Sequence, residues 1–167
     1  MTAPPGRVAI VGAGTTPLVA ELARAGFQVT AIDISATAIT ALKQQLPDPA
    51  AVELLVADVR SLRVEHPFDT WHDRAVFHFL TDTDDQRAYI ERATAAIRVG
   101  GHLVIATFAE QGPNQCSGLP VARHSAHSLS VAFGRHFEVV DSFERDHITP
   151  RATPQRFTHA VLRRTPR

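Results

Sequence analysis

Several residue types that carry reaction chemistry are scarce in this sequence. Cys116 is the only cysteine among the 167 residues, which excludes an intrachain disulfide and a zinc site built from thiolates alone. Lys43 is the only lysine, and the spacing of its apolar neighbours predicts the outer face of a helix for it. Catalysis by a Schiff-base lysine, a phosphate-loop lysine or a Tyr-x-x-x-Lys pair is therefore not expected.

The chain also lacks an excess of either charge. Lysine and arginine together number 17, as do aspartate and glutamate, so the formal net charge is zero. The sequence contains no basic block, so we expect no nucleic-acid partner. No apolar run approaches the length of about 20 residues that spans a bilayer. Met1–Gly6 is too short and polar for a signal peptide, so we expect a cytoplasmic protein with no membrane partner. The length predicts one domain over residues 1–167.

The stretch V-A-I-V-G-A-G-T-T-P-L-V, residues 8–19, has the pattern of a strand, a glycine turn and a helix. Four apolar residues lead into Gly12 and Gly14, which let the backbone bend sharply and approach a ligand closely. The N–H groups at the start of the helix offer donors and a partial positive charge. This stretch therefore predicts a site for a nucleotide-like ligand.

Apolar strands and amphipathic helices alternate along the rest of the chain. This alternation predicts an α/β fold with a Rossmann-like, doubly wound sheet, mostly parallel and closed by an antiparallel C-terminal edge strand. We expect Thr15 or Thr16 to cap the first helix, Gly100–Gly101 to form a turn, and Glu110–Arg123 to form a long loop. Strands are expected at 7–12, 27–32, 52–57, 68–75, 102–108, 137–143 and 157–163, and helices at 16–25, 36–46, 83–98 and 125–135.

Polar residues follow the predicted parallel strands. In such sheets, ligands bind outside the carboxyl ends of the strands, near the point where the strand order reverses. Asp33 lies 21 positions after Gly12, a spacing typical of a carboxylate that binds a ribose. The other strand ends carry the glycine turn, Asp58, His72-Asp73-Arg74 and Phe108–Glu110.

These motifs resemble those of the class I S-adenosylmethionine-dependent methyltransferases, which have a seven-stranded sheet. The resemblance rests on Gly-Ala-Gly after the first strand, A-I-D-I-S at Asp33, V-A-D-V-R-S-L at Asp58, and R-V-G-G-H-L-V-I-A-T-F at residues 98–108. It covers residues 7–164. It departs from the family pattern at Ile10, where an acidic residue is common, and at Thr16, where a third glycine is common.

The resemblance implies S-adenosylmethionine as the cofactor. Gly12 and Gly14 would then pass the methionine portion, Asp33 would accept hydrogen bonds from both ribose hydroxyls, and Asp58 would accept one from the adenine amino group. The stretch W-H-D-R-A-V-F-H-F-L would line the methyl-transfer pocket. The candidate cofactor-binding residues are Gly12, Ala13, Gly14, Asp33, Ile34, Asp58, Val59 and His72.

Methyl transfer asks for proximity and a dry pocket, and an acceptor that carries a proton also asks for a base. Asp73 and His78 are the candidates for that base. Cys116, in the loop after the fifth strand, would suit a soft acceptor such as a thiol, selenium or metalloid compound. No short ligand-pair spacing predicts a metal site. The candidate substrate-binding residues are Trp71, Arg74, Phe108, Cys116 and His124.

The sequence therefore predicts a methyltransferase that acts on a small molecule. Two alternatives remain: a protein lysine methyltransferase, because Asp-Arg-Ala at Asp73 resembles the Asp-Lys-Gly of one branch of those enzymes, and a non-catalytic module that binds a nucleoside or NAD. We expect no helices before the first strand to cover the substrate. The cover is expected from the loop at 110–123 or from a second subunit, so a homodimer is also considered.

Overall fold

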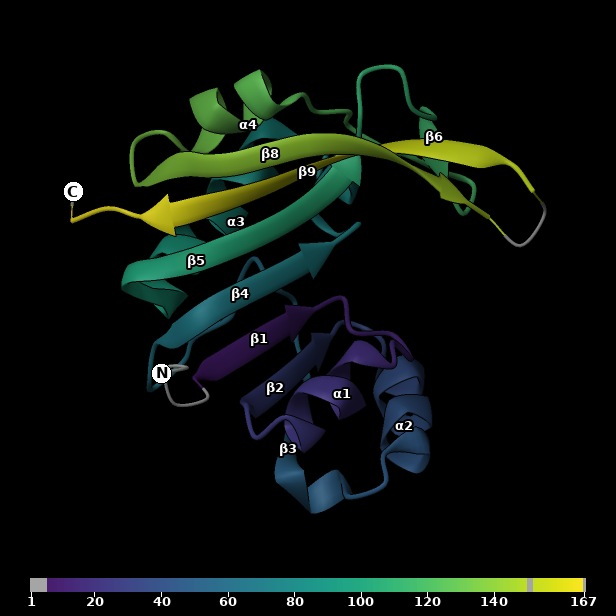
Figure 1. Ribbon diagram of the computed structural model, residues 1–167, viewed down its shortest axis with the longest axis vertical. Helices are drawn as coiled ribbons and strands as arrows, with labels where there is room; N and C mark the ends of the chain where they lie inside the picture. Colours follow the sequence, from purple (N-terminus) through teal and green to yellow (C-terminus); the bar gives the residue numbers. More distant parts are fainter. Residues whose placement is uncertain (1–5, 150–151, 167) are drawn as a thin grey trace.

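The computed structural model describes residues 6–149 and 152–166. Its main feature is a seven-stranded sheet with the order β3-β2-β1-β4-β5-β9-β8 (Figure 1). The first five strands in this order are parallel, whereas β9 is antiparallel to β5, and β8 pairs antiparallel with β9 at the outer edge. The predicted fold class is confirmed. The strands are β1 (Arg7–Val11), β2 (Gln28–Asp33), β3 (Val52–Val56), β4 (Phe68–Arg74), β5 (Ile97–Phe108), β8 (Phe137–Ile148) and β9 (Pro154–Arg164).

Helices cover the two faces of the sheet unequally. Val19 of α1 (Leu18–Arg24) and Leu42 of α2 (Ala36–Gln45) pack with Ile10 of β1 in one apolar cluster. Tyr89 of α3 (Thr83–Ala96) and Phe133 of α4 (Ala126–Phe133) belong to a second cluster on the other face. In Figure 1, α1 lies in front of the sheet and α3 behind it. Within the described ranges, no helix is long and apolar enough to cross a membrane.

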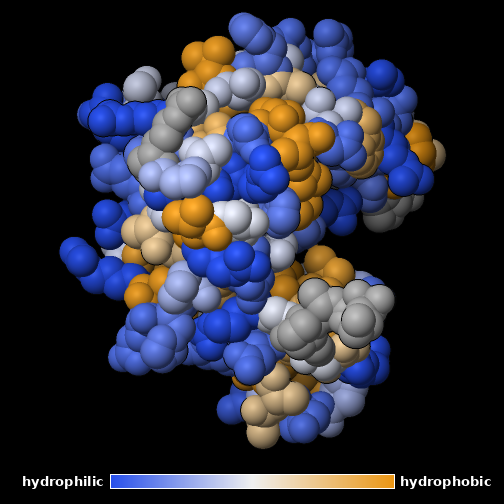
Figure 2. Space-filling model, turned by 60° about the vertical axis from the view of Figure 1, so that its left-hand side comes forward, coloured by the Kyte–Doolittle hydropathy of each residue, from blue (hydrophilic) through white to orange (hydrophobic). Residues whose placement is uncertain are grey.

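The face covered by α1 and α2 is open over half of the sheet. His72 of β4 pairs with Ile10, so its side chain points to the same face. His72 in turn pairs with Val104 of β5, and Val104 pairs with Val161 of β9, so both valines lie on this face as well. All three side chains at these outer positions are only partly buried. Figure 2 shows the outline hollowed between its upper part, at the height of β8 and β9 in Figure 1, and its lower part, at the height of α1.

The start of α1 differs from the prediction. The residue that precedes the helix is Pro17, whose side chain makes no capping hydrogen bond. The Oγ1 of Thr16 accepts the N–H of Leu18, the first helical residue, at 3.4 Å, so Thr16 contributes to the helix start from one position further out. The N–H of Thr16 donates to the carbonyl of Ala13, which keeps this residue in the glycine turn. The turn is therefore two residues longer than the sequence pattern indicates, and the proline ring begins the helix instead.

The predicted turn at Gly100–Gly101 is wrong, because β5 begins at Ile97 and runs through both glycines. The pairing with β4 shifts between Phe68 and Thr70, which is a β-bulge, and Gly100 has a φ of 80°. A Cβ at Gly101 would come within 2.9 Å of the Asp69 carbonyl oxygen. The glycines thus let two strands approach at an irregular step, and the helix before them ends at Ala96 rather than at residue 98.

Two predicted loops contain more structure than expected. The segment Glu110–Arg123 includes a small hairpin, β6 (Gln115–Cys116) with β7 (Leu119–Pro120). Strands β8 and β9 are several residues longer than predicted, so their hairpin projects past the carboxyl ends of the parallel strands (Figure 1). The predicted turn between them includes residues 150–151, which lie outside the described ranges, as do residues 1–5 of the N-terminal stretch. Short 3₁₀ helices occur at Pro49–Ala51 and Phe77–Phe79.

Phe133 anchors α4 to the larger apolar cluster. Its ring is fully buried and packs against Phe77, Tyr89 and Phe137 at centroid distances of 5.1, 6.4 and 5.8 Å. Phe133→Ala should lower the free energy of unfolding by about 3–5 kcal/mol, because it removes buried apolar area and leaves a cavity. Val131→Ala on the exposed side of the same helix should change it by less than about 0.5 kcal/mol. Urea unfolding measures both, and equal effects would contradict this packing.

Candidate functional site

A crevice of about 540 Å³ lies at the carboxyl ends of β1, β2, β3 and β4. It opens where the strand order reverses between β1 and β4, the position at which doubly wound sheets bind ligands. Its walls combine carboxylates with apolar side chains. The residues that line it include Gly12, Asp33, Ile34, Asp58, Val59, Arg60, Arg74, Val76, Phe79 and Leu80.

Gly12 forms the floor at the end of β1. It has a φ of 62°, in the region that favours glycine, and a Cβ there would come within 2.1 Å of the Val76 side chain. Gly14 also has a positive φ, of 50°. A side chain at Gly12 would collide with Val76, so the glycine allows the end of β1 and the loop after β4 to approach each other at the floor of the crevice.

Asp33 holds the second wall in place. Its Oδ2 accepts a hydrogen bond from the Gly14 N–H at 2.8 Å, and its Oδ1 accepts one from the Ser35 N–H at 2.9 Å. The carboxylate thereby connects the end of β2 to the glycine turn. Because a carboxylate offers about four acceptor positions, about two remain for a ligand in the crevice.

Asp58 already has a partner in this arrangement. Its Oδ2 forms an ion pair with Arg60 Nη2 at 2.6 Å, and the same guanidinium contacts Asp85 at 2.7 Å. Hydrogen bonding to Arg60 lowers the pKa of Asp58, which stays ionised. Such a partly exposed pair contributes about 1 kcal/mol or less, so a ligand amino group can displace the guanidinium, or share the Asp58 carboxylate with it, at low cost.

A second cavity, of about 470 Å³, adjoins the crevice. The two share Val11, Gly12, Arg74 and Ala75, so they meet at the ends of β1 and β4. The second cavity extends over the open face of the sheet. Its other lining residues include Thr16, His72, Phe108, Cys116, His147, Gln155 and Phe157. We call this space the acceptor cavity.

A family model described as a methyltransferase domain matches residues 8–101, more than half of the chain. The chain belongs to this methyltransferase family. The matched segment extends from the second residue of β1 into β5, and it contains every residue that lines the crevice apart from Leu119. No curated protein sequence matches this methyltransferase.

Solved structures share the fold over nearly the whole chain. An S-adenosylmethionine-dependent methyltransferase from Methanosarcina mazei is 17% identical, with a TM-score of 0.82 over 98% of this chain and 94% of that one. The 1,6-didemethyltoxoflavin-N1-methyltransferase of Burkholderia thailandensis, solved with 1,6-didemethyltoxoflavin and S-adenosylhomocysteine, is 24% identical, with a TM-score of 0.77 over 96% and 72%. A protein that converts a disulfide bond into a thioacetal during echinomycin biosynthesis is 24% identical, with a TM-score of 0.78 over 96% and 76%.

The predicted family, the enzyme class and S-adenosylmethionine as cofactor are confirmed. The residues of the crevice fit that cofactor. The backbone of Gly12 lines the crevice without a side chain, so a ligand can approach it closely, and the fixed carboxylate of Asp33 suits a pair of hydroxyls. Arg60 and the apolar side chains of Phe79 and Leu80 offer a partly dry surface for a flat ring.

Five of the predicted cofactor residues line the crevice: Gly12, Asp33, Ile34, Asp58 and Val59. Gly14 contributes its N–H to Asp33 instead. Ala13 is buried, and its N–H donates to the carbonyl of Ile32 behind the turn. His72 lies in the acceptor cavity rather than in the crevice, because its side chain points to the open face of the sheet.

The two candidate bases lie outside both cavities. Asp73 is 1% exposed, and its carboxylate accepts hydrogen bonds from the Val76 N–H, the Phe77 N–H and the Tyr89 hydroxyl at 2.9, 3.1 and 2.6 Å. His78 is fully buried, and burial lowers its pKa to about 4. A base at either residue stays a prediction. Asp73 holds the loop after β4 in place.

Trp71 and His124 line neither the crevice nor the acceptor cavity, so their contact with a substrate stays a prediction. Trp71 is fully buried, and its indole Nε1 donates to the Tyr89 hydroxyl at 3.0 Å. His124 is buried against Phe77, with ring centroids 5.1 Å apart. Successive residues of β4 point to opposite faces, so Trp71 enters the core while His72 enters the acceptor cavity.

The other predicted substrate residues, Arg74, Phe108 and Cys116, do line the acceptor cavity. The sequence did not indicate His147, Gln155 or Phe157, which join them there from the β8–β9 hairpin. Arg60 of the crevice was also missed, although its position two residues after Asp58 was a usable signal. The hairpin residues carried no such signal, since only the pairing of β9 with β5 brings them to the site.

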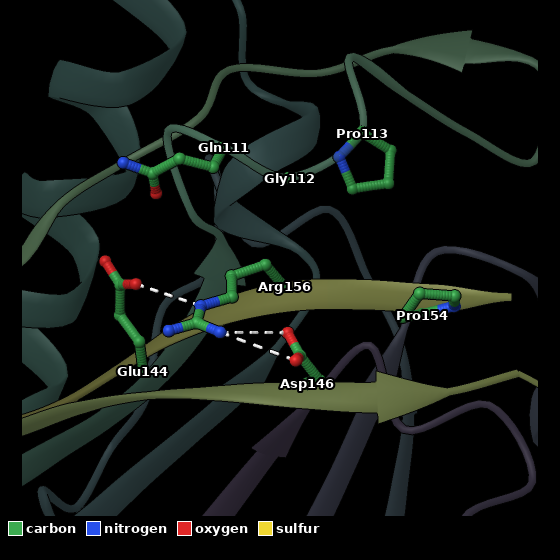
Figure 3. A pocket seen from close by; sticks show the side chains of 7 residues that line it. All are labelled: Gln111, Gly112, Pro113, Glu144, Asp146, Pro154 and Arg156. Atoms are coloured by element: carbon green, nitrogen blue, oxygen red, sulfur yellow. Dashed lines mark hydrogen bonds and ion pairs between the residues drawn. The ribbon is translucent and has the colours of Figure 1, made fainter.

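A further pocket, of about 700 Å³, lies on the opposite face of the β8–β9 hairpin, against Gln111, Gly112 and Pro113 (Figure 3). Its charged groups are paired with one another. Arg156 contacts Glu144 at 3.1 Å and Asp146 at 3.4 Å, as the dashed lines show. It shares no lining residue with the crevice or the acceptor cavity, so it takes no part in the site.

The buried carboxyl of Asp73 should make stability depend on pH. Burial raises its pKa from 3.8 to about 6, despite the hydrogen bonds from Tyr89, Val76 and Phe77 that lower it. The folded protein therefore keeps a proton between pH 4 and pH 6 that the unfolded chain has lost. The resulting stability is present below pH 4 and is lost as the pH rises through 6, by about 3 kcal/mol.

Asp73→Asn removes this titration and leaves one buried donor facing a backbone N–H, which costs about 1–3 kcal/mol. Urea unfolding of both proteins between pH 4 and pH 6.5 should show the stability of the wild type falling toward that of the variant as the pH rises. A stability difference that stays constant over this range would show that Asp73 is already ionised at pH 4.

Proposed function

We propose that this methyltransferase transfers the methyl group of S-adenosylmethionine to a small molecule held in the acceptor cavity. The observation that carries the proposal is the junction of the two cavities at Val11, Gly12, Arg74 and Ala75. Asp33 would accept hydrogen bonds from the ribose hydroxyls, and Asp58 would accept one from the adenine amino group. Gly12 would pass the methionine portion toward the junction.

Bound S-adenosylmethionine supplies an electrophilic methyl group, so the chain has to position an acceptor and exclude water. Phe108 and Phe157, both buried, form an apolar wall with ring centroids 4.8 Å apart. The β6–β7 hairpin brings Cys116 to the same cavity. Because Asp73 and His78 lie away from it, we propose that proximity and desolvation carry the reaction without a base at these positions.

Cys116 supports a soft acceptor such as a thiol, selenium or metalloid compound. Its half-buried sulfur lies in a cavity with two aromatic rings, where a polarisable group packs well. The structural neighbour whose reaction converts a disulfide bond into a thioacetal also acts on sulfur. A small-molecule acceptor is therefore our proposal, and the predicted homodimer stays a prediction.

Calorimetric titration with S-adenosylmethionine, S-adenosylhomocysteine and NAD tests the cofactor site. We expect the first two to bind and NAD to give no saturable heat. Asp33→Ala should weaken the binding of S-adenosylhomocysteine at least about 30-fold, because two hydrogen bonds to a charged acceptor are lost, along with the hydrogen bond that holds Gly14. Asp48→Ala, a carboxylate that caps a 3₁₀ helix away from the crevice, is the control and should bind normally.

Unchanged binding in Asp33→Ala would contradict the assigned ribose contact. Saturable NAD binding that Asp33→Ala abolishes would instead support a nicotinamide-binding module. Binding of S-adenosylmethionine without consumption of the donor by any acceptor would support a non-catalytic nucleoside-binding protein.

A donor-consumption screen against thiols, amines, selenium compounds and arsenic compounds tests the acceptor. We expect turnover with the soft nucleophiles. Cys116→Ser should lower kcat/KM for them about fivefold, because it replaces a polarisable contact, and should leave S-adenosylhomocysteine affinity unchanged. Ser117→Ala, at an exposed neighbouring position, is the matched control. Turnover with amines alone would exclude the soft acceptor.

A further inference from the structure

The acceptor cavity continues into a recess of about 390 Å³ under the β8–β9 hairpin. The recess shares Arg74, His147 and Phe157 with the acceptor cavity. Arg145 and His159 complete its basic lining, and we call these residues together with Arg74 and His147 the basic recess. It lies on the open face of the sheet, where no described helix covers it.

The guanidinium groups of the basic recess have no carboxylate partner in the described part of the chain. Arg74 Nη2 contacts only His147 Nδ1, at 3.5 Å, and Arg145 forms no ion pair there. The single acid of the lining, Asp146, has both carboxylate oxygens 3.4 Å from Arg156 on the other face of the hairpin. The recess therefore carries uncompensated positive charge.

This positive charge helps to lower the pKa values of the neighbouring histidines. Burial lowers the pKa of His159, and the guanidinium groups of Arg74 and Arg145 lower it further. Burial and then Arg74 also lower the pKa of His72, which lies between the recess and the crevice. A site that keeps cations together without a counter-ion is arranged for an anionic ligand.

We propose that the basic recess binds an oxyanion group, a carboxylate or a phosphate, on the methyl acceptor, so that the substrate is an anionic small molecule. This inference rests on the proposed function and adds the substrate class to it. The planar guanidinium of Arg145 can donate two parallel hydrogen bonds to such a group, and Arg74 can donate from the side of the crevice.

The position of the recess gives the substrate a direction. The anionic group would lie beneath the β8–β9 hairpin, which projects past the strand ends (Figure 1), and the reacting atom would extend through the acceptor cavity toward Gly12. Cys116 and Phe108 lie between these two ends. The arrangement separates recognition of charge from the place where the methyl group is transferred.

Inorganic phosphate and acetate are suitable probes, because they carry the two oxyanion types without a nucleophile. Each is titrated at pH 7 into the full chain saturated with S-adenosylhomocysteine, and NMR follows the histidine ring signals. We expect saturable shifts at His147 and His159. Arg145→Gln should raise the anion concentration at half-saturation about tenfold, because it removes a charged side chain that can donate two hydrogen bonds. Binding of phosphate alone or acetate alone supports the proposal and identifies the anion type.

Arg163→Gln is the matched control, because Arg163 lies on the same face of β9 but is paired with Glu138 at the other end of the strand. It should leave the phosphate titration unchanged. Histidine shifts that do not saturate, or that persist unchanged in Arg145→Gln, would overturn the proposal that the substrate is anionic. If S-adenosylhomocysteine binds while neither anion does, this inference fails alone, whereas loss of S-adenosylhomocysteine binding in the wild type defeats the proposed function itself.

Discussion

The parallel pairing of β1 with both β2 and β4 is the constraint on which the site depends. It places Val11 opposite Ile32 on one side and Asp73 on the other, so three strands end at nearly the same level. The chain must then leave each strand end in a different direction, and the crevice opens between them. Asp33 stabilises this divergence, because its carboxylate accepts the N–H of Gly14 across the gap. The same contact leaves acceptor capacity free in the crevice.

The period of two along β4 divides one sequence motif between two tasks. His72 and Arg74 face the open side of the sheet, where they line the acceptor cavity. Trp71 and Asp73 face α3, where both are hydrogen-bonded to Tyr89 in the core. This buried network supports the loop that carries the far wall of the crevice. The buried residues Trp71 and Asp73 therefore position the site, whereas His72 and Arg74 on the open face of the sheet are free to contact ligands.

The antiparallel strand β9 brings a distant part of the chain to the site. Its pairing with β5 places Phe157 opposite Phe108, and the hairpin beyond this pair reaches past the parallel strands. The hairpin supplies Arg145, His147 and His159 of the basic recess, and it adds His147, Gln155 and Phe157 to the acceptor cavity. The crevice is thus built at the ends of the first four strands, whereas the surface that would recognise an acceptor also needs residues of the last two. This division suits a family in which one cofactor serves many substrates.

The sequence by itself determined the strands, the helices and the carboxylates at the strand ends, because hydrophobic periodicity and glycine turns act over a few neighbouring residues. Gly12, Asp33 and Asp58 were all predicted in the crevice, and all three line it. Tertiary structure alone decided which side chains share the acceptor cavity. Arg74 and His147 lie 73 positions apart and meet only because β9 pairs with β5 and β8 pairs with β9, and no local pattern encodes that register.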